Sequence, residues 1–415
     1  MTPVIRQQVV DSLARSLLTN YIFRDTAARM GNYIRRRLKE GAYDRITKPN
    51  EFAATLTADL HSVYNDLHLG IQFDPQLEKM LQDTSTTDQE ERRKENIRRE
   101  AHQNFGFKKV EILNANIGYL SFDGFFGVNA ESRATVNGAF AFLKNIDALI
   151  IDLRHNGGGE PQMVQYICSH LLPAKTHIND LYERRIDKTY PSWTDSLDNP
   201  ASFYTMPVYI LTARRTFSGA EEFAYDLQTQ HRATVVGETT GGGAHPVGPE
   251  TISNGFIGNI PFARAINPIT HTNWEATGVK PDLRVGADSA LDAAILAYYS
   301  DRINHATDSN AIRPVIWARD MLLAQLHPVQ VDTAILKTLV GNFGARRALI
   351  YRNGSLYYVN AVGMETKLVP LSETAFKPVD IDQIKIELKK DSRGQVTTLY
   401  LVYDDGGGAQ FPRTQ

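Results

Sequence analysis

The chain has 415 residues, with 45 lysines and arginines against 47 aspartates and glutamates, so its formal net charge is −2 at pH 7. This balance argues against a general nucleic-acid or anionic-membrane binder. Hydrophobic residues make up 42% and charged residues 22%, a composition typical of globular proteins that excludes disordered and fibrous classes. At roughly 150 residues per domain, the length predicts two or three domains.

The single cysteine, Cys168, excludes an intramolecular disulfide and a multi-cysteine metal site, and its apolar neighbours predict a packing role. No stretch approaches the roughly 20 apolar residues that a membrane span needs. The first residues, Met1 to Gln8, lack the basic and then apolar pattern of a signal peptide. The compartment therefore stays open.

Residues 1–103 are predicted to form a helical N-terminal domain. Val9, Leu13 and Leu17 recur at a spacing of four, and a similar pattern returns between Phe52 and Val63, as expected for helices with one buried face. The segment 83–103 is almost wholly polar. We interpret it as a solvated helix or a mobile connector, with a hinged lid as the alternative.

Residues 104–305 are predicted to form an α/β domain. Short apolar runs at 117–122, 148–153 and 207–212 read as strands because they are rich in β-branched and aromatic residues and end in turns. Predicted helices alternate with them at 130–145, 160–172, 218–230 and 288–302. This alternation favours a sheet covered by helices, with catalytic loops at the strand ends.

Residues 306–332 are predicted to be a helical linker with a helix near 313–327, and 333–415 a small antiparallel β domain. Asn353-Gly354 lies between two alternating runs, and this dipeptide is the strongest short-range signal for a hairpin. With further strands at 383–388 and 397–403, we expect a small antiparallel sheet or open barrel.

A first candidate site segment runs from Asp152 to Pro161, where a buried strand leads into three glycines and then a helix. Gly157 and Gly158 lack a Cβ, so their backbone N–H groups can turn toward an oxyanion near a helix start. The alternative is a flexible turn. The spacing does not match the glycine patterns of nucleotide-binding loops.

Ser218 is a second candidate, because a serine between a strand and a helix can present its hydroxyl as a nucleophile beside the N–H of Gly219. Ser218 and Glu221 also match a capping box, so the serine could instead cap the helix. The local sequence leaves both interpretations open.

Two further candidates carry groups that assist a nucleophile. Glu275, beside Trp274, could orient a base, although a surface acid before a turn fits the local sequence as well. His68 could be a base, although a lone histidine near apolar residues is more often structural.

Together these segments resemble the S41 peptidase superfamily, which includes tail-specific processing peptidases, the tricorn core protease and the interphotoreceptor retinoid-binding protein. The matching elements are DLRHNGGG at 152–159, TFSGAEEF at 216–223, VVGETTGGGAHP at 235–246 and WEATGVKPD at 274–282. The resemblance covers about half the chain. It implies a crotonase-like β/α spiral for the central domain.

The resemblance implies that Ser218 is the nucleophile and that Gly219, with the Gly157–Gly158 loop, forms the oxyanion hole. The tail-specific branch uses a lysine base at a position that falls here on Gly243, and no lysine occurs between Ser218 and Val279. A serine-lysine dyad is therefore not expected.

The tricorn-like branch implies a histidine base supported by a glutamate, which correspond here to His68 and Glu275. The tricorn protease has a serine immediately before its histidine that links the two, whereas this chain has Leu67. Contact between His68 and Glu275 would therefore be direct or bridged otherwise. His245 is the reserve candidate for the base.

The resulting expectation is a serine peptidase that acts on a peptide or protein substrate, with no metal or organic cofactor. The alternatives are a non-catalytic binding protein for an apolar ligand and a hydrolase of small esters. No peptide-tethering insertion precedes the core, and no assembly signature is visible, so the oligomeric state stays open. The resemblance points to bacterial proteins that are usually exported.

Overall fold

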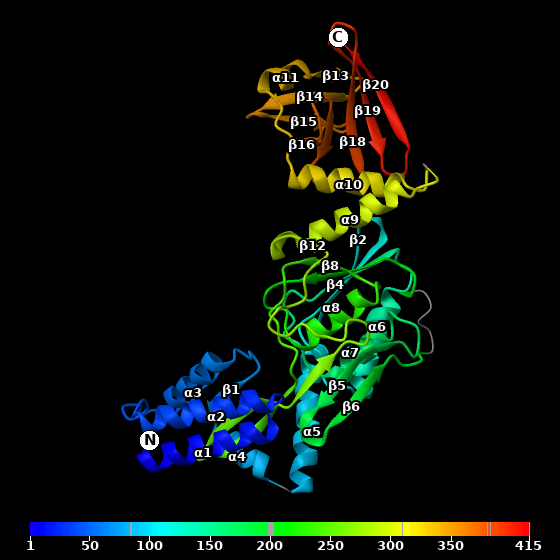
Figure 1. Cartoon of the computed structure of the whole chain (residues 1–415). Helices are drawn as coiled ribbons and strands as arrows, with labels where there is room; N and C mark the ends of the chain where they lie inside the picture. The colour runs from blue at the N-terminus through cyan, green and yellow to red at the C-terminus, as the bar shows by residue number, and fades with distance from the viewer. Residues whose placement is uncertain (84, 198–202, 309, 380, 382, 415) are drawn as a thin grey trace. The chain divides into compact units, whose positions relative to one another are not determined.

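A computed structural model describes residues 1–414 except 84, 198–202, 309, 380 and 382. The described chain divides into two compact units, Met1–Ala294 and Ile295–Gln415. The predicted fold class is confirmed, because the structure has N-terminal helices, a central sheet with helices and a C-terminal antiparallel β domain (Figure 1). None of the described helices combines the length and apolar character needed to cross a bilayer.

The N-terminal part is mainly helical, as predicted. Its elements are α1 (Pro3–Asn20), α2 (Arg24–Lys39), α3 (Pro49–Val63), β1 (Gly70–Phe73), α4 (Pro75–Gln82) and α5 (Thr86–His102). The predicted stripe of Val9, Leu13 and Leu17 is fully buried, together with Phe52 and Leu56 of α3. Burial of one face of α1, α2 and α3 therefore forms the core of this part.

The central sheet is mostly parallel. Among the described residues, six strands form it in the order β12-β8-β7-β4-β3-β2, and only the β2–β3 pair is antiparallel. The strands are β2 (Phe107–Leu113), β3 (Ile117–Phe122), β4 (Ala148–Asp152), β7 (Val208–Thr212), β8 (Thr234–Gly237) and β12 (Leu283–Arg284). Strands β4 and β7 are buried throughout, as expected for parallel strands covered on both faces.

The helices of the central part follow the predicted order. They are α6 (Ala130–Phe142), α7 (Pro161–Cys168) and α8 (Gly219–Thr229), and α9 (Ala290–Asn304) comes next along the chain. Helix α7 is shorter than the predicted range 160–172. Pro173 explains part of this difference, since a proline disfavours helical backbone in the residue before it.

Two small antiparallel sheets were not predicted. One has the order β1-β10-β9, with β9 (Val247–Ser253) and β10 (Phe256–Pro261), and the other has the order β11-β5-β6. The strands of the second sheet are β5 (His177–Glu183), β6 (Lys188–Trp193) and β11 (Ala263–Ile266). The first sheet joins the N-terminal part to a hairpin that lies nearly 190 residues later, so sequence-local patterns could not reveal it.

The second unit is built on a closed barrel rather than an open one. In its described residues, eight antiparallel strands close the barrel: β13 (Gly341–Phe343), β14 (Arg347–Arg352), β15 (Ser355–Val359), β16 (Glu365–Pro370), β17 (Ala375–Pro378), β18 (Ile384–Lys390), β19 (Val396–Tyr403) and β20 (Gly408–Thr414). The helices α10 (Arg313–Leu326) and α11 (Thr333–Thr338) precede the barrel along the chain. Asn353 and Gly354 have φ of 50° and 80°, so the predicted hairpin turn is confirmed.

A buried arginine links the first helix to the segment between α2 and α3. The Nη1 atom of Arg6, on α1, lies 3.0 Å from each of the carbonyl oxygens of Tyr43, Asp44 and Ile46. A charged donor that satisfies buried carbonyls stabilises the fold more than a neutral one.

We expect Arg6→Met to lower the free energy of unfolding by about 2–4 kcal/mol, because methionine keeps the alkyl packing but leaves the carbonyls without their donor. Urea denaturation monitored by circular dichroism measures this change. Arg15→Met, on the exposed face of the same helix, is the control and should change the value by about 0.5 kcal/mol or less. Equal losses in the two variants would contradict the interpretation.

Candidate functional site

The candidate residues of the core lie in loops that follow neighbouring parallel strands. Strand β4 leads into the glycine loop, β7 into Ser218, and β8 into the segment 238–246. Since β4 pairs with β7 and β7 with β8, the three loops leave the same edge of the sheet. This edge is where ligand sites of α/β sheets form.

Ser218 has a strained backbone at the start of α8. Its φ of 54° and ψ of −123° lie outside the usual regions for a residue with a side chain. The glycine loop packs closely against it, because a Cβ at Gly158 would lie 2.7 Å from the Gly219 nitrogen. The turn therefore holds the serine in a fixed position between the strand and the helix.

Glu221 stabilises this turn with a buried carboxylate. It accepts hydrogen bonds from the N–H groups of Ser218 at 2.9 Å, Gly242 at 2.7 Å and Gly243 at 2.8 Å, and from the hydroxyl of Thr240. Burial raises the pKa of Glu221 despite these donors. The predicted capping residue thus connects the serine turn to the loop after β8.

His68 faces the serine. The Ser218 hydroxyl lies 3.0 Å from Nε2 of His68, although the two residues are 150 positions apart. The ring also packs beside Phe217, with 4.6 Å between ring centroids. Burial lowers the pKa of His68 to about 4, so the imidazole is neutral at pH 7 and can accept a proton from the hydroxyl.

Gly243 lies close to the rings of His68 and Phe217. A Cβ built on Gly243 would lie 2.6 Å from Cε1 of His68 and 2.3 Å from Cζ of Phe217. Any side chain at this position, including a lysine, would therefore compete with the His68 ring for the same space.

Asp66 lies behind His68 and is completely buried. It accepts the backbone N–H of His68 at 3.1 Å, the hydroxyl of Tyr21 at 3.0 Å and Nδ1–H of His245 at 2.8 Å. Burial raises the pKa of Asp66, but the hydrogen bonds from His245 and Tyr21 outweigh it and lower the pKa below its usual value. The carboxylate therefore fixes the backbone that carries the imidazole.

Glu275 approaches the same histidines from the loop before Val279. It accepts the N–H of Ala244 at 2.7 Å and lies 3.5 Å from Nδ1 of His245. Burial raises the pKa of Glu275 to about 7, although His245 acts in the opposite direction. The surface-acid interpretation of Glu275 does not fit this burial.

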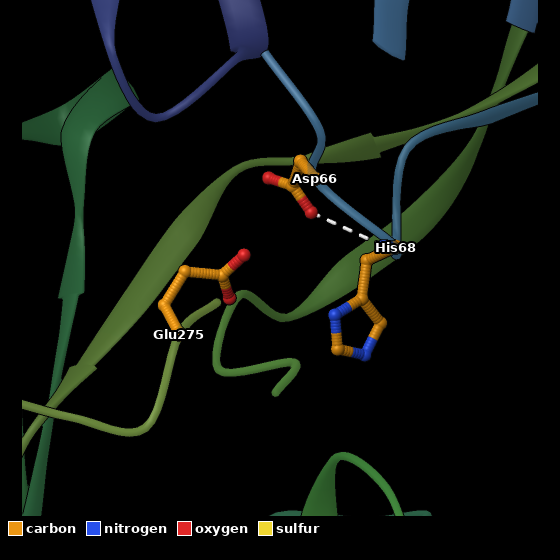
Figure 2. Close-up of side chains that lie close together, drawn as sticks. All are labelled: Asp66, His68 and Glu275. Atoms are coloured by element: carbon orange, nitrogen blue, oxygen red, sulfur yellow. Dashed lines mark hydrogen bonds between the residues drawn. The ribbon is translucent and has the colours of Figure 1, made fainter. Parts of the chain in front are cut away.

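A gap separates Glu275 from His68. Among the described residues, Nδ1 of His68 and Oε1 of Glu275 are both buried and have no hydrogen-bond partner, and Figure 2 shows the Nδ1 side of the ring facing the carboxylate. The atoms of Asp66, His68 and Glu275 that could bind a metal ion lie within 4.8 Å of one another. A metal ion would accept this spacing, but His68 already faces Ser218 and Asp66 already accepts two side-chain donors.

His245 occupies a different place from His68. Its side chain is 1% exposed, and its Nδ1 lies between Asp66 and Glu275. Its ring packs edge-on against Phe23, with 5.3 Å between centroids. The structure thus brings His68 to the serine and places His245 among the carboxylates behind it.

The three glycines of the loop differ in what their N–H groups do. The Gly158 N–H donates to Oδ1 of Asn156 at 2.9 Å, and that of Gly157 is directed at the carbonyl of Asp123 at 3.4 Å. Gly159 forms a parallel bridge with Phe125, in which the hydrogen bonds are made by its neighbours Gly158 and Glu160. The N–H of Gly159 itself therefore points away from Phe125.

A cavity of about 420 Å³ opens beside these groups. Its wall includes His68, Ser218, Gly219 and Gly159, but neither Gly157 nor Gly158. Ser218, His68 and the two glycines therefore border one space that can receive a ligand.

Sequence reasoning missed the supporting residues Asp66, Tyr21, Asn156 and Gly159, and gave Glu221 a capping role alone. Asp66 lies two residues before His68, and an aspartate this close to a candidate base was a usable signal. Tyr21 has no such signal, since it reaches Asp66 from the end of α1, 45 residues earlier.

Solved structures provide a first comparison. The photosystem II D1 C-terminal processing protease is 22% identical over 41% of this chain and 43% of its own length, with a TM-score of 0.35. A lipoprotein from Streptococcus agalactiae is 14% identical over 72% and 96%, with a TM-score of 0.49. The tricorn protease is 13% identical over 70% and 35%, with a TM-score of 0.42. The chain thus spans less than half the length of the first and third of these proteins.

Family models provide the second comparison. The model described as peptidase family S41 matches residues 116–285, which contain the glycine loop, Ser218 and Glu275. The model described as the N-terminal domain of peptidase S41 in eukaryotic IRBP matches residues 5–108, which contain His68. The two matches follow one another along the chain and include every element of the site described above. The chain therefore belongs to peptidase family S41.

Proposed function

We propose that this chain is a serine peptidase that hydrolyses peptide bonds through an acyl-enzyme on Ser218. The observation that carries the proposal is the 3.0 Å approach of Nε2 of His68 to the Ser218 hydroxyl. A nucleophile and a base within hydrogen-bond distance, on a strained turn beside a cavity, form the arrangement that acyl transfer requires.

In this proposal His68 is the general base. It takes the Ser218 proton during attack on the carbonyl carbon and later gives it to the leaving amine. Because burial keeps the ring neutral, it starts in the accepting form. The imidazolium that forms then faces the carboxylates of Asp66 and Glu275, which stabilise its charge.

Glu275 orients and supports the imidazole in this proposal. An ionised Glu275 accepts from Nδ1–H of His68 and so selects the tautomer whose Nε2 is free to receive the serine proton. With Leu67 in place of a linking serine, the gap is closed by a bridging water or by a small movement of the ring.

The oxyanion would be held by the N–H groups of Gly219 and Gly159. Gly219 follows the nucleophile, and a Cβ built on it would lie 3.1 Å from the Gly159 nitrogen, so the two N–H groups are neighbours. We prefer Gly159 to Gly157 and Gly158, because the N–H of Gly158 is already held by Asn156. Two convergent N–H donors would stabilise the charge that develops in the transition state.

A fluorophosphonate probe tests this proposal. We expect the wild type to be labelled at Ser218, Ser218→Ala not to be labelled, and His68→Ala to react about 10²- to 10⁴-fold more slowly. Rates from gel fluorescence and mapping of the modified peptide by mass spectrometry give these results. His155→Ala, an exposed histidine on the glycine loop, is the control and should react at the wild-type rate.

Three other labelling results would change the assignment of the base or of the function. Normal labelling of His68→Ala with loss in His245→Ala would move the base to His245. No labelling of the wild type between about pH 6 and 9 would contradict the enzyme and favour a binding protein for an apolar ligand. A labelled protein that cleaves small esters but no peptides would be an esterase.

We expect Gly243→Ala to slow labelling of Ser218 to about the level of His68→Ala, because the added methyl group takes space that the packed rings of Phe217 and His68 occupy and displaces the imidazole. The measurement is the fluorophosphonate rate together with the melting temperature. Gly138→Ala, on α6 with open space around its Cα, is the control. A wild-type labelling rate in folded Gly243→Ala would contradict the steric argument.

The pH dependence of labelling tests the role of Glu275. Below its pKa of about 7 the carboxyl is protonated and no longer accepts from Nδ1–H, so the rate should fall about tenfold per pH unit as the pH decreases. Above about pH 7 the rate should level off. Glu275→Gln should remove this step and lower the plateau by up to about 10⁴-fold. A step that persists near pH 7 in Glu275→Gln would assign the titration to another group.

A further inference from the structure

The cavity beside Ser218 has an acidic lining. Glu160 and Glu222 contribute carboxylates, and Gln162, Gln165, Asn179, Tyr190 and Ser192 contribute neutral polar groups. Within the described part of the chain, its wall holds no lysine or arginine, and its histidine is His68. The lining therefore suits a positively charged group better than a negatively charged one.

Glu222 is the more buried of these two carboxylates. It is 8% exposed, whereas Glu160 lies on the surface. Ser218 is the N-cap of α8, and Glu222 lies in the first turn of that helix. Side chains on a helix lean toward its N-terminus, which directs Glu222 toward the turn that carries the nucleophile.

The hydrogen-bonding capacity around Glu222 is not fully used. Oε1 accepts from Nδ2 of Asn179 at 2.9 Å. Asn179 is 3% exposed, and its Oδ1 has no partner among the described residues. A buried amide oxygen and a buried carboxylate in the same cavity wall are both acceptors, so an occupant must bring several N–H donors to satisfy them.

We infer that this cavity receives the side chain of a lysine or arginine that precedes the scissile peptide bond, with Glu222 and Asn179 as the specificity-determining residues. This inference rests on the proposed function. The lining of the cavity includes Ser218, Gly219 and Gly159, the groups that would hold the acyl carbonyl, and the acyl carbonyl belongs to the residue before the cleaved bond. Glu222, in the first turn of the helix that Ser218 caps, lines the same cavity, so one space joins the position of the acyl carbonyl to this carboxylate.

A second carboxyl group supports the charge assignment. Asp226, one turn further along α8, is fully buried and accepts from Asn267 at 3.4 Å. Burial and the neighbouring Glu222 raise the pKa of Asp226 well above its usual value. Burial also raises the pKa of Glu222, to about 7, so this carboxyl group ionises near neutral pH, and a bound ammonium or guanidinium would favour its ionised form.

Two pairs of fluorogenic peptides test the inference, each with one change at the residue before the cleaved bond: lysine against norleucine, and arginine against citrulline. We expect kcat/KM to be about 10²-fold or more higher for the cationic member of each pair, because norleucine brings no N–H donor to the buried acceptors and citrulline brings fewer donors and no charge. In Glu222→Gln, which keeps the shape and the Asn179 contact, the preference should fall below about tenfold. In Glu160→Gln it should persist.

Binding measured without catalysis separates this inference from the proposed function. Ser218→Ala should bind p-aminobenzamidine, an amidinium whose fluorescence rises on burial, and Ser218→Ala with Glu222→Gln should bind it at least about tenfold more weakly. Glu222-dependent binding by a protein that no fluorophosphonate labels would support the cation site while the proposed peptidase fails. Equal binding by the two variants, equal cleavage within each peptide pair, or a preference that follows Glu160 would overturn the inference.

Discussion

The site depends on the antiparallel pairing of β1 with β10. His68 lies two residues before β1, and the pairs Gly70↔Asn259 to Phe73↔Phe256 fix where that strand begins. Ile252, Phe256 and Ile260 share one apolar core with the N-terminal helices, so burial of this core holds the register. A shift of one residue would turn each β1 side chain to the opposite face and carry His68 away from Ser218. The imidazole can therefore come from a segment 150 positions before the serine.

The second constraint is the concentration of buried carboxylates around one nucleophile. Burial of an isolated carboxylate costs several kcal/mol, and each of these groups offsets that cost differently. Asp66 is ionised because His245 and Tyr21 donate to it, and Glu221 accepts backbone N–H groups that also hold the serine turn. Burial raises the pKa of Glu275 to about 7, because it has fewer donors to offset the burial. The network thus gives neighbouring carboxyl groups different protonation states at neutral pH, which allows them different roles.

The sequence predicted most of the fold but less of the site. Helices such as Ala130–Phe142 and Gly219–Thr229 and the Asn353-Gly354 hairpin follow from local periodicity and turn chemistry. The β1-β10-β9 sheet was missed because its strands are far apart in the sequence. Ser218, His68 and Glu275 were named in advance through the family resemblance, whereas their local sequences left structural roles open. The hydrogen bond from the Gly158 N–H to Asn156 depends on the direction of the backbone within the loop. Residue types alone do not predict that direction.

The space around Gly243 ties the loop after β8 to the position of His68. The rings of Phe217 and His68 fill the volume that a side chain at 243 would need. Glu221 also holds the Gly243 N–H at 2.8 Å, so the loop cannot move away without loosening the turn that carries Ser218. A side chain at 243 would therefore have to displace the ring of Phe217, the ring of His68 or both. Gly243 thus lets the His68 ring lie against Phe217 and reach Ser218, with Asp66 and His245 behind it.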